Sequence, residues 1–530
     1  MFLLSIFSYA TEVHSWNELC NEIKKNTSEI VLMNDIECTF LLELTSGTIE
    51  IKSTPGFQYT IKPESNYKGS FISLKNGIHV KLSHLNISNF QNKTIQSNTK
   101  TNHTLLYGAI YNDHSNIEIS DCSFYGNSFY YGGAIFNNSG SITLSHCSFW
   151  NNSSYYNPNL SYYTSNLENV SGGGAIFNNS GNITLSHCFF MNNSSNLFNT
   201  TDDNEAGGGA IFNNSGSVTL SHCSLSNNSS NYGGAIDNEA NGSMNITDCS
   251  FSNNVVSDDG GAIWNGGNMT IENCSFSNNN ASSFGSAVCN YNTMNLTSCS
   301  FSGNIAHYSG CVFNYNIMNL VNCSFFNNTA KYNGGALCNY VTMNIINCSF
   351  SGNFAERNGG AISNSHDLHI YNSILYGNYD SNGANDLYNN KGTLSLYYCL
   401  YGIENTTQLS AIKCIPLKTD KENLQNIFKN IIQKDNKNYG ALSEKNVFEI
   451  QSIKEVATCG TKCGYYTENE IIHYCYYDTE SLSWKNNNGD VIDEKKITIY
   501  NRDTLNNNRL TNEKTGYSIG AVVANNVIYN

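Results

Sequence analysis

Short runs of alternating apolar and polar residues return along the chain at a nearly constant interval. In one copy they cover residues 134–137, 141–145 and 147–150, and glycine, asparagine and serine separate them. Alternation with a period of two predicts β-strands, and the intervening residues predict tight turns. Since no run within a copy has helical periodicity, each copy is predicted to form three short strands.

Two motifs mark each copy. The first is GGA(I/L/V) or a close variant, which begins at Gly108, Gly132, Gly173, Gly208, Gly233, Gly260, Gly285, Ser309, Gly334 and Gly359. The second is CSFxxN or a close variant, with its cysteine at Cys122, Cys147, Cys188, Cys223, Cys249, Cys274, Cys299, Cys323 and Cys348. Copies lie 24 to 26 residues apart wherever no insertion intervenes. One period held over so many copies predicts an all-β solenoid, a right-handed parallel β-helix of about 25 residues per turn.

The alternation also assigns the interior face. Ile135 and Asn137 share one face, and the equivalent positions remain aliphatic and asparagine in the other copies. Stacked asparagines can exchange hydrogen bonds between turns, which satisfies polar groups at a buried bend. Stacked cysteines do not have the geometry of a disulfide, so we predict buried thiols. The predicted interior columns are those of Ile135, Asn137, Ile142, Leu144, Cys147 and Phe149.

The pairing of GGA(I/L/V) with FxxN resembles the polymorphic outer membrane protein (Pmp) family. The resemblance covers residues 108 to about 380, and it depends on recurrence of the two motifs rather than on any one copy. It implies a parallel β-helix and a surface-exposed or secreted adhesin.

The sequence around the repeats predicts a capped solenoid. Residues 1–10 are similar to a signal peptide, and residues 11–105 are predicted to form the first turns, with a helix from Trp16 to Lys25 covering the open end. Residues 106–400 hold the repeats. Residues 401–530 form a non-repeat region, in which a helix is predicted for residues 420–434. Cys20 and Cys38 are predicted to form a disulfide bond.

Composition narrows the class of function. The formal net charge is -15 and the chain has only three arginines, so nucleic acid is not an expected partner. No run of 18 apolar residues occurs, so no transmembrane segment is predicted. Frequent N-x-S/T sequons favour a secreted or cell-surface glycoprotein, with glycosylation predicted at Asn159, Asn169, Asn199 and Asn405.

Two insertions between FxxN and GGA supply the candidate binding site. Loops on a rigid scaffold often carry function, and stacking would place both insertions at one corner. We predict binding by their aromatic side chains, Tyr155, Tyr156, Tyr162, Tyr163 and Phe198. The alternative is a solvated insertion without function. A second candidate is a row of outward-facing aromatic side chains, which consists of Phe136, Phe177, Phe212 and Trp264. This row is either exposed and available for binding, or covered by the insertions and therefore structural.

Catalytic chemistry has weaker signals. Parallel β-helices also host polysaccharide lyases and glycoside hydrolases, which need carboxylates in pairs or beside a basic residue. The candidate acids lack a recurrent basic neighbour and are Asp202, Asp203, Asp237, Asp258 and Asp259. His146, His187 and His222 occupy one repeat position, where a metal site is less expected than simple duplication.

The sequence therefore predicts a non-catalytic adhesin-like protein without cofactor or metal. Its expected partner is a host-cell receptor, the extracellular matrix or a glycan. A polysaccharide-degrading enzyme and a structural surface-coat spacer are the alternatives.

Overall fold

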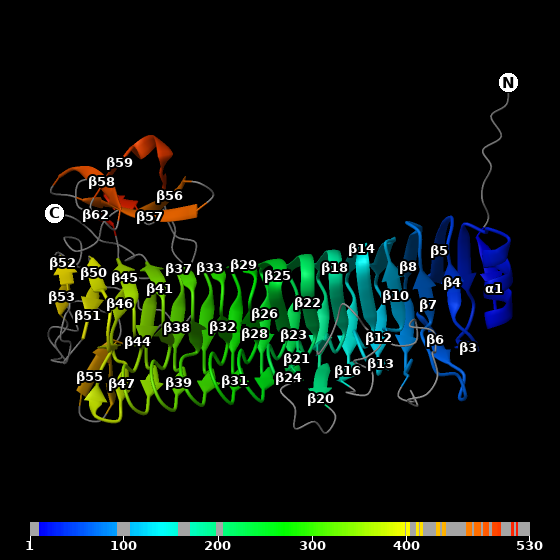
Figure 1. Cartoon of the computed structure of the whole chain (residues 1–530), viewed down its shortest axis with the longest axis horizontal. Coiled ribbons are helices and arrows are strands. Elements are labelled where there is room, and N and C mark those ends of the chain that lie inside the picture. The colour runs from blue at the N-terminus through cyan, green and yellow to red at the C-terminus, as the bar shows by residue number, and fades with distance from the viewer. Residues whose placement is uncertain are drawn as a thin grey trace. The chain divides into compact units, whose positions relative to one another are not determined.

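The computed structural model describes residues 10–92, 107–156, 170–197, 205–397 and 399–402 in long stretches. Beyond these it describes residues 410–412, 414–416, 431–434, 437–440, 463–468, 471–478, 481–486, 490–499, 510–512 and 516–517. The chain forms two compact units, the N-terminal unit (Met1–Met269) and the C-terminal unit (Thr270–Asn530). Strands from successive turns lie side by side in each unit (Figure 1).

A short helix begins the N-terminal unit, as predicted. Helix α1 (Trp16–Lys24) starts at Ser15, whose side chain accepts a hydrogen bond from the Glu18 backbone N–H, while the Glu18 carboxylate accepts from the backbone N–H of His14. Such reciprocal bonds satisfy N–H groups that have no partner within the helix. Trp16 and Leu19 are buried, so the helix covers the apolar end of the first turns.

Three parallel sheets form the N-terminal unit. Sheet A contains β1 (Thr11–Val13), β2 (Glu29–Leu32), β4 (Leu42–Leu44), β5 (Thr48–Ser53), β7 (Ile72–Leu74), β8 (His79–Ser83), β10 (Ile110–Asp113), β11 (Asn116–Ser120), β14 (Ile135–Ser145), β18 (Ile176–Ser186), β22 (Ile211–Ser221), β25 (Ile236–Thr247) and β28 (Ile263–Asn265). Sheet B contains β3 (Ile36–Cys38), β6 (Tyr59–Pro63), β9 (Leu85–Ser88), β12 (Ser123–Tyr125), β15 (Ser148–Trp150), β19 (Phe189–Met191), β23 (Ser224–Ser226) and β26 (Ser250–Ser252). Sheet C contains β13 (Ser128–Phe129), β16 (Ser153–Tyr156), β20 (Ser194–Leu197), β24 (Ser229–Ser230) and β27 (Val255–Val256). Strands β17 (Val170–Gly172) and β21 (Glu205–Gly207) pair with each other, and β29 (Asn268–Glu272) includes the boundary between the units.

The C-terminal unit repeats this arrangement. Its sheet A strands are β32 (Val288–Asn290), β33 (Thr293–Thr297), β36 (Val312–Asn314), β37 (Ile317–Val321), β40 (Leu337–Asn339), β41 (Thr342–Ile346), β44 (Ile362–Asn364), β45 (Asp367–Tyr371), β49 (Leu387–Asn389), β50 (Leu394–Tyr397) and β52 (Ser410–Ile412). Its sheet B strands are β30 (Ser275–Ser277), β34 (Ser300–Ser302), β38 (Ser324–Phe326), β42 (Ser349–Ser351), β46 (Ile374–Leu375), β51 (Leu400–Tyr401) and β53 (Ile415–Pro416). Its sheet C strands are β31 (Asn280–Ala281), β35 (Ile305–Ala306), β39 (Thr329–Ala330), β43 (Phe354–Ala355) and β47 (Tyr379–Asp380), and β48 (Gly383–Ala384) pairs antiparallel with β47.

The last described stretches are antiparallel. One sheet has the strand order β59 (Val491–Ile492), β58 (Ser483–Asn486), β57 (Ile471–Asp478), β56 (Cys463–Glu468) and β60 (Thr498–Ile499), and a single 3₁₀ turn, η3 (Glu494–Lys496), precedes β60. Two hairpins pair β54 (Ile431–Lys434) with β55 (Lys437–Gly440), and β61 (Leu510–Asn512) with β62 (Gly516–Tyr517). The helix predicted for residues 420–434 is therefore wrong for Ile431–Lys434, and residues 420–430 lie outside the described residues.

Every turn places the repeat positions inside, as predicted. In the copy at 132–150 the six predicted interior side chains are all buried. The phenylalanines of sheet B stack ring on ring, with centroids 4.7 Å apart from Phe124 to Phe149 and from Phe149 to Phe190. The architecture is thus the predicted parallel β-helix. The structure differs in detail because the first two predicted strands merge in β14, and a short extra strand follows FxxN in sheet C.

Asparagine columns run beside the apolar ones. In the N-terminal unit the amide of Asn137 donates to the side-chain oxygen of Asn178 at 2.8 Å, and Asn178 donates to Asn213 at 2.8 Å. The FxxN asparagines form a second column, in which Asn152 donates to Asn193 at 3.0 Å and to the Phe124 carbonyl oxygen at 3.0 Å. These bonds satisfy the buried polar groups at the bends of each turn.

The cysteines of the repeat are thiols. Cys147 and Cys188 are buried and free, and the Sγ of each donates to a carbonyl oxygen two residues earlier. Burial raises the pKa of Cys122 well above its ordinary value, so its thiol stays protonated. Cys20 and Cys38 are also free and buried, so the predicted disulfide between them is not formed in this structure.

Candidate recognition surfaces

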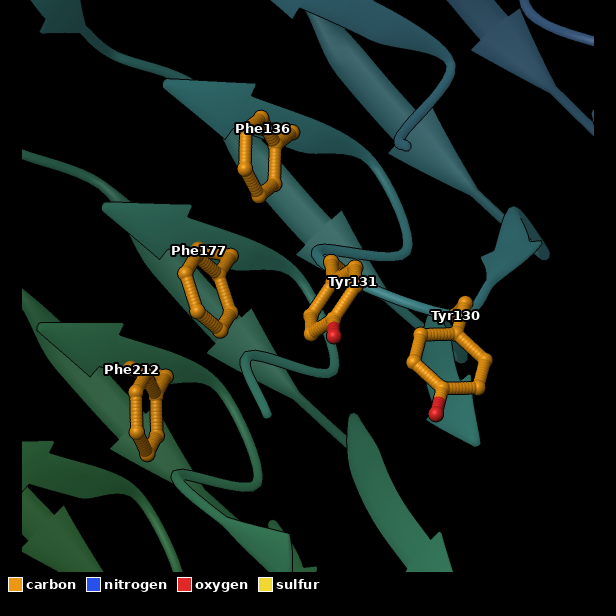
Figure 2. Close-up of a cluster of buried hydrophobic side chains, with 5 residues drawn as sticks. All are labelled: Tyr130, Tyr131, Phe136, Phe177 and Phe212. Carbon is orange, nitrogen blue, oxygen red and sulfur yellow. The ribbon is translucent and has the colours of Figure 1, made fainter. Parts of the chain in front are cut away.

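The outward aromatic row predicted as a binding strip is buried. Phe136, Phe177 and Phe212 are 2%, 0% and 1% exposed and form one cluster with Tyr130 and Tyr131. Figure 2 shows the three phenylalanine rings in a row from successive turns, with the two tyrosines beside them. Neighbouring phenylalanine rings stack with centroids 5.2 and 4.8 Å apart. The expectation of an exposed strip is wrong here, and the alternative of a covered, structural row holds for these three residues.

Segments distant in sequence cover this row. The ring of Tyr107 lies 4.4 Å from that of Phe136 between centroids. Strands β17 and β21, which return from the two insertions, lie over Phe212, and a Cβ atom at Gly172 would overlap its ring. Glycine at that position therefore lets the returning strand approach the aromatic row closely.

The other predicted binding residues have different surroundings. Tyr155 packs against the same cluster, and its hydroxyl donates to the carbonyl oxygen of Asn92. Burial raises the pKa of Tyr155. Trp264 is half-buried, with its ring 6.4 Å from that of Tyr232. Outside the described residues lie the side chain of Tyr156 and all of Tyr162, Tyr163, Phe198, Asn159, Asn169, Asn199 and Asn405.

An exposed patch that the sequence did not predict lies on the outer face of sheet B in the N-terminal unit. We call it the sheet-B patch, and it consists of Tyr125, Trp150, Phe189 and Met191. These side chains are 40%, 42%, 58% and 39% exposed. Tyr125, Trp150 and Met191 occupy one register position on three successive turns, while Phe189 pairs with Ser148 and Ser224.

Two side chains of the sheet-B patch, Trp150 and Tyr125, are fixed through a hydrogen bond and a ring contact. The indole N–H of Trp150 donates to the hydroxyl of Ser123 at 3.2 Å. The rings of Tyr125 and Trp150 are in edge-on contact, with their centroids 5.1 Å apart. Phe149 and Phe190, on the opposite face of the same strands, are buried in the stacked interior column. A large exposed aromatic group on such a fixed backbone is the usual composition of a contact surface.

A second exposed surface lies in the C-terminal unit. Tyr291, Tyr315 and Tyr340 each follow the asparagine that ends a sheet A strand, and they are 36%, 52% and 41% exposed. Their rings lie 5.5 and 6.0 Å apart between centroids, one ring per turn. Beneath them Phe313 is buried and contacts Tyr340 at 5.3 Å.

A parallel column continues this surface. Tyr308, which is 44% exposed, stacks on Tyr332 at 5.1 Å between centroids. Phe284 joins the two columns, since its ring lies 5.6 Å from Tyr308 and 4.7 Å from Phe313. We call the whole surface the tyrosine strip, which consists of Phe284, Tyr291, Tyr308, Phe313, Tyr315, Tyr332 and Tyr340.

The histidine column is formed by bends of the backbone. His146, His187 and His222 each have a φ of 53°, in the left-handed region, where histidine, asparagine and aspartate are enriched. Their rings stack at 4.9 and 4.8 Å, and the His222 imidazole lies 3.8 Å from the Asp248 carboxylate. Within the described part of the chain, no group of three or more histidine, cysteine or acidic side chains is placed to hold a metal ion.

The acids considered for catalysis have structural contacts where they are described. Asp237 is buried in the column between Phe212 and Trp264. The Asp258 carboxylate accepts a hydrogen bond from the Tyr232 hydroxyl at 2.9 Å. Asp259 is buried, and Asp202 and Asp203 lie outside the described residues.

Stacked turns of parallel strands, with asparagine columns inside and aromatic surfaces outside, define a β-helical repeat protein. The model of the Chlamydia polymorphic membrane protein repeat matches the chain at residues 248–266, 322–340 and 347–365. Each match runs from the CSFxxN motif to the end of the next GGA motif. The chain therefore carries polymorphic membrane protein repeats, which confirms the family resemblance.

Other comparisons are sparse. A solved structure, the crystal structure of bacteriophage CBA120 tailspike protein 3, is 9% identical with a TM-score of 0.25. The match covers 89% of this chain and 66% of the tailspike chain. A comparison with curated proteins finds no match. No helix among the described residues is long and apolar enough to cross a membrane.

Both exposed surfaces left a weak signal in the sequence. Tyrosine follows asparagine at the end of three successive GGA motifs, as Asn290–Tyr291, Asn314–Tyr315 and Asn339–Tyr340. That recurrence could have identified the first column of the tyrosine strip. Phe189 differs from the serine of its neighbouring copies by a single replacement, so its exposure could be inferred only once the strand register was known.

Proposed function

We propose that this chain is a non-catalytic, adhesin-like recognition protein that acts at the cell surface or in its surroundings. The polymorphic membrane protein repeats support a surface role. The β-helix supplies a stiff scaffold, since its turns are fixed by interior stacking and by asparagine hydrogen bonds. Its partner is a macromolecule of a host cell or of the extracellular matrix.

The observation that carries this proposal is the sheet-B patch. Phe189 and Met191 stand where the next turn has Ser224 and Ser226, so the fold does not require apolar side chains at these positions. Exposing them to water is unfavourable, and burial against a partner recovers roughly 25 cal/mol per Å² of apolar area. Trp and Tyr are also the side chains most often responsible for binding energy at protein interfaces.

Binding of the purified full chain to cultured host cells and to matrix preparations tests the proposal. The informative variant is W150S/F189S/M191S, in which the replacements of Phe189 and Met191 match Ser224 and Ser226 on the next turn. The matched control is V255S, because Val255 is 46% exposed in sheet C and pairs with Ser229 on the neighbouring turn.

The wild-type chain should bind saturably, and the triple variant should bind roughly tenfold more weakly or worse, because hot-spot side chains contribute about 2 kcal/mol or more. V255S should bind like the wild type. Lack of saturable wild-type binding would contradict the recognition function. Unchanged binding by a triple variant with the wild-type circular dichroism spectrum would remove the sheet-B patch from it.

A further inference from the structure

The tyrosine strip of the C-terminal unit is accompanied by cations. Arg357 follows Tyr308 and Tyr332 in the same register position, and its guanidinium carbon lies 4.2 Å from the centre of the Tyr332 ring. Lys331, one residue before Tyr332, is exposed like Arg357. His307 occupies the position of Lys331 on the preceding turn. Three successive turns thus present His307, Lys331 and Arg357 beside the aromatic rings.

These cations are available to a ligand. Neither Lys331 nor Arg357 forms an ion pair or a hydrogen bond through its side chain with any described residue. The guanidinium of Arg357 makes a cation–π contact with the Tyr332 ring, and a cation–π contact leaves the N–H donors free to bind a planar anion. Glu356 is the neighbouring acid, on the same turn as Arg357. Because its single negative charge stands against the two positive charges of Lys331 and Arg357, this surface is locally positive in a chain of formal net charge -15.

We propose that the tyrosine strip binds a saccharide chain that carries isolated carboxylate groups. Arg357 and Lys331 hold the carboxylates, and the edges and hydroxyls of the tyrosines contact the sugar rings. The proposal rests on the proposed recognition function and names a ligand class for a second surface of the same chain.

The spacing of the strip suits a polymer of rings. Tyr291, Tyr315 and Tyr340 recur once per turn because β32, β36 and β40 pair in register. Turns of a β-helix rise about 4.8 Å, close to the length of one sugar residue. Amides line the columns, since Asn358 donates to Asn333 at 3.0 Å and Asn316 donates to the Tyr291 carbonyl oxygen at 3.3 Å. A saccharide along the strip therefore meets one ring edge and one amide at each turn.

Other macromolecules fit this surface less well. A stable protein interface needs an apolar centre that the partner can bury. Phe313, the apolar centre of the strip, is only 3% exposed, so it is already buried within the chain. A nucleic acid carries a charge on every nucleotide and needs many cations, which an acidic chain with two exposed cations here does not supply. Isolated carboxylates need only a few cations, and a guanidinium binds a carboxylate through two parallel hydrogen bonds.

Direct titration of the purified full chain with defined saccharides tests the proposal. The probes are a hyaluronan hexasaccharide, whose carboxylates are uronates, and 3′-sialyllactose, whose carboxylate is a sialate. Lactose serves as the neutral counterpart of sialyllactose. The variant R357Y removes the cation and extends the tyrosine column. The variant Y315S/Y340S removes two tyrosine rings and replaces them by serine, the residue that the next turn has at this position, as Ser365.

The wild-type chain should bind at least one acidic probe, and lactose should bind at least about tenfold more weakly. R357Y should weaken acidic-probe binding about tenfold, because it removes a charge-assisted hydrogen bond to the carboxylate. Y315S/Y340S should weaken it too, and added salt should lower the wild-type affinity. The control K391Q, which removes a different exposed lysine of the same unit, should bind like the wild type.

Three results would overturn the proposal. They are binding of neither acidic probe, equal affinity for lactose and sialyllactose, and R357Y with unchanged affinity. Cells are absent from this assay, so its failure leaves the proposed function intact if the chain still binds cells. Conversely, a chain that binds saccharide but not cells or matrix refutes the proposed function alone.

Discussion

At the scale of single residues, one side chain ends the FxxN asparagine column of the C-terminal unit. Asn353 donates to Asn378 at 2.8 Å, and Asn378 donates to the carboxylate of Asp386 at 2.8 Å. The other carboxylate oxygen accepts from the Gly402 backbone N–H at 2.9 Å. Burial raises the pKa of Asp386 to about 7, although these donors favour the charged form.

This pKa predicts a pH dependence of stability. The folded pKa of about 7 lies above the ordinary value of 3.8, so the folded state retains its proton where the unfolded state has lost it. The contribution of Asp386 to the free energy of unfolding is therefore complete below about pH 4 and is lost as the pH rises to about 7. Above this window the contribution no longer changes.

The D386N variant removes this titration. Thermal unfolding of wild type and variant, compared near the lower limit of this window at about pH 4.5 and about one unit above its upper limit at about pH 8, should show D386N less sensitive to pH than the wild type. An identical loss of melting temperature in the two proteins between these pH values would contradict a protonated, buried Asp386.

At the scale of structural elements, the turns are joined by columns of equivalent side chains. Asn304 illustrates the connection, because it accepts two hydrogen bonds from Asn279 and donates to Asn328 at 2.9 Å and to the Phe276 carbonyl oxygen at 3.0 Å. Its side chain is fully buried, so water cannot replace these bonds. Each asparagine thus connects the turn before it with the turn after it.

Replacing Asn304 by alanine should lower the free energy of unfolding by about 3–5 kcal/mol, because several buried donors and acceptors lose their partner. The control N280A removes an exposed asparagine from β31 and should change stability by less than about 0.5 kcal/mol. Chemical denaturation followed by circular dichroism measures both. A loss for N304A no larger than that for N280A would show that the column is not a source of stability.

The elements also show how far the sequence predicts this structure. The columns of Ile135 and Phe149 were predictable because contacts between equivalent positions one turn apart follow from the repeat itself. The burial of the row from Phe136 to Phe212 was not predictable, because Tyr107 covers Phe136 and strands that return after the insertions cover Phe212. Merged strand β14 was likewise missed, since Ser139 between its halves reads as a turn residue.

At the scale of the whole molecule, the proposed function depends on exposed surfaces rather than on a catalytic centre. The aromatic row that was predicted as a binding strip, that of Phe136, lies in the core. The exposed aromatic side chains instead form the sheet-B patch and the tyrosine strip. Exposure of single positions such as Phe189 depends on which face a strand turns outward, and this requires the register. Both surfaces lie on strands or at their ends, where the backbone holds their side chains in fixed positions.

Binding and cleavage measured together distinguish non-catalytic recognition from a polysaccharide-degrading activity. The purified chain is incubated with host cells and matrix, and bound protein and released saccharide fragments are measured in the same sample. A non-catalytic recognition protein should bind saturably, with no fragments released above the level of a buffer control. Release of fragments that increases with protein concentration would contradict non-catalytic recognition and would direct attention to Asp237, Asp258 and Asp259.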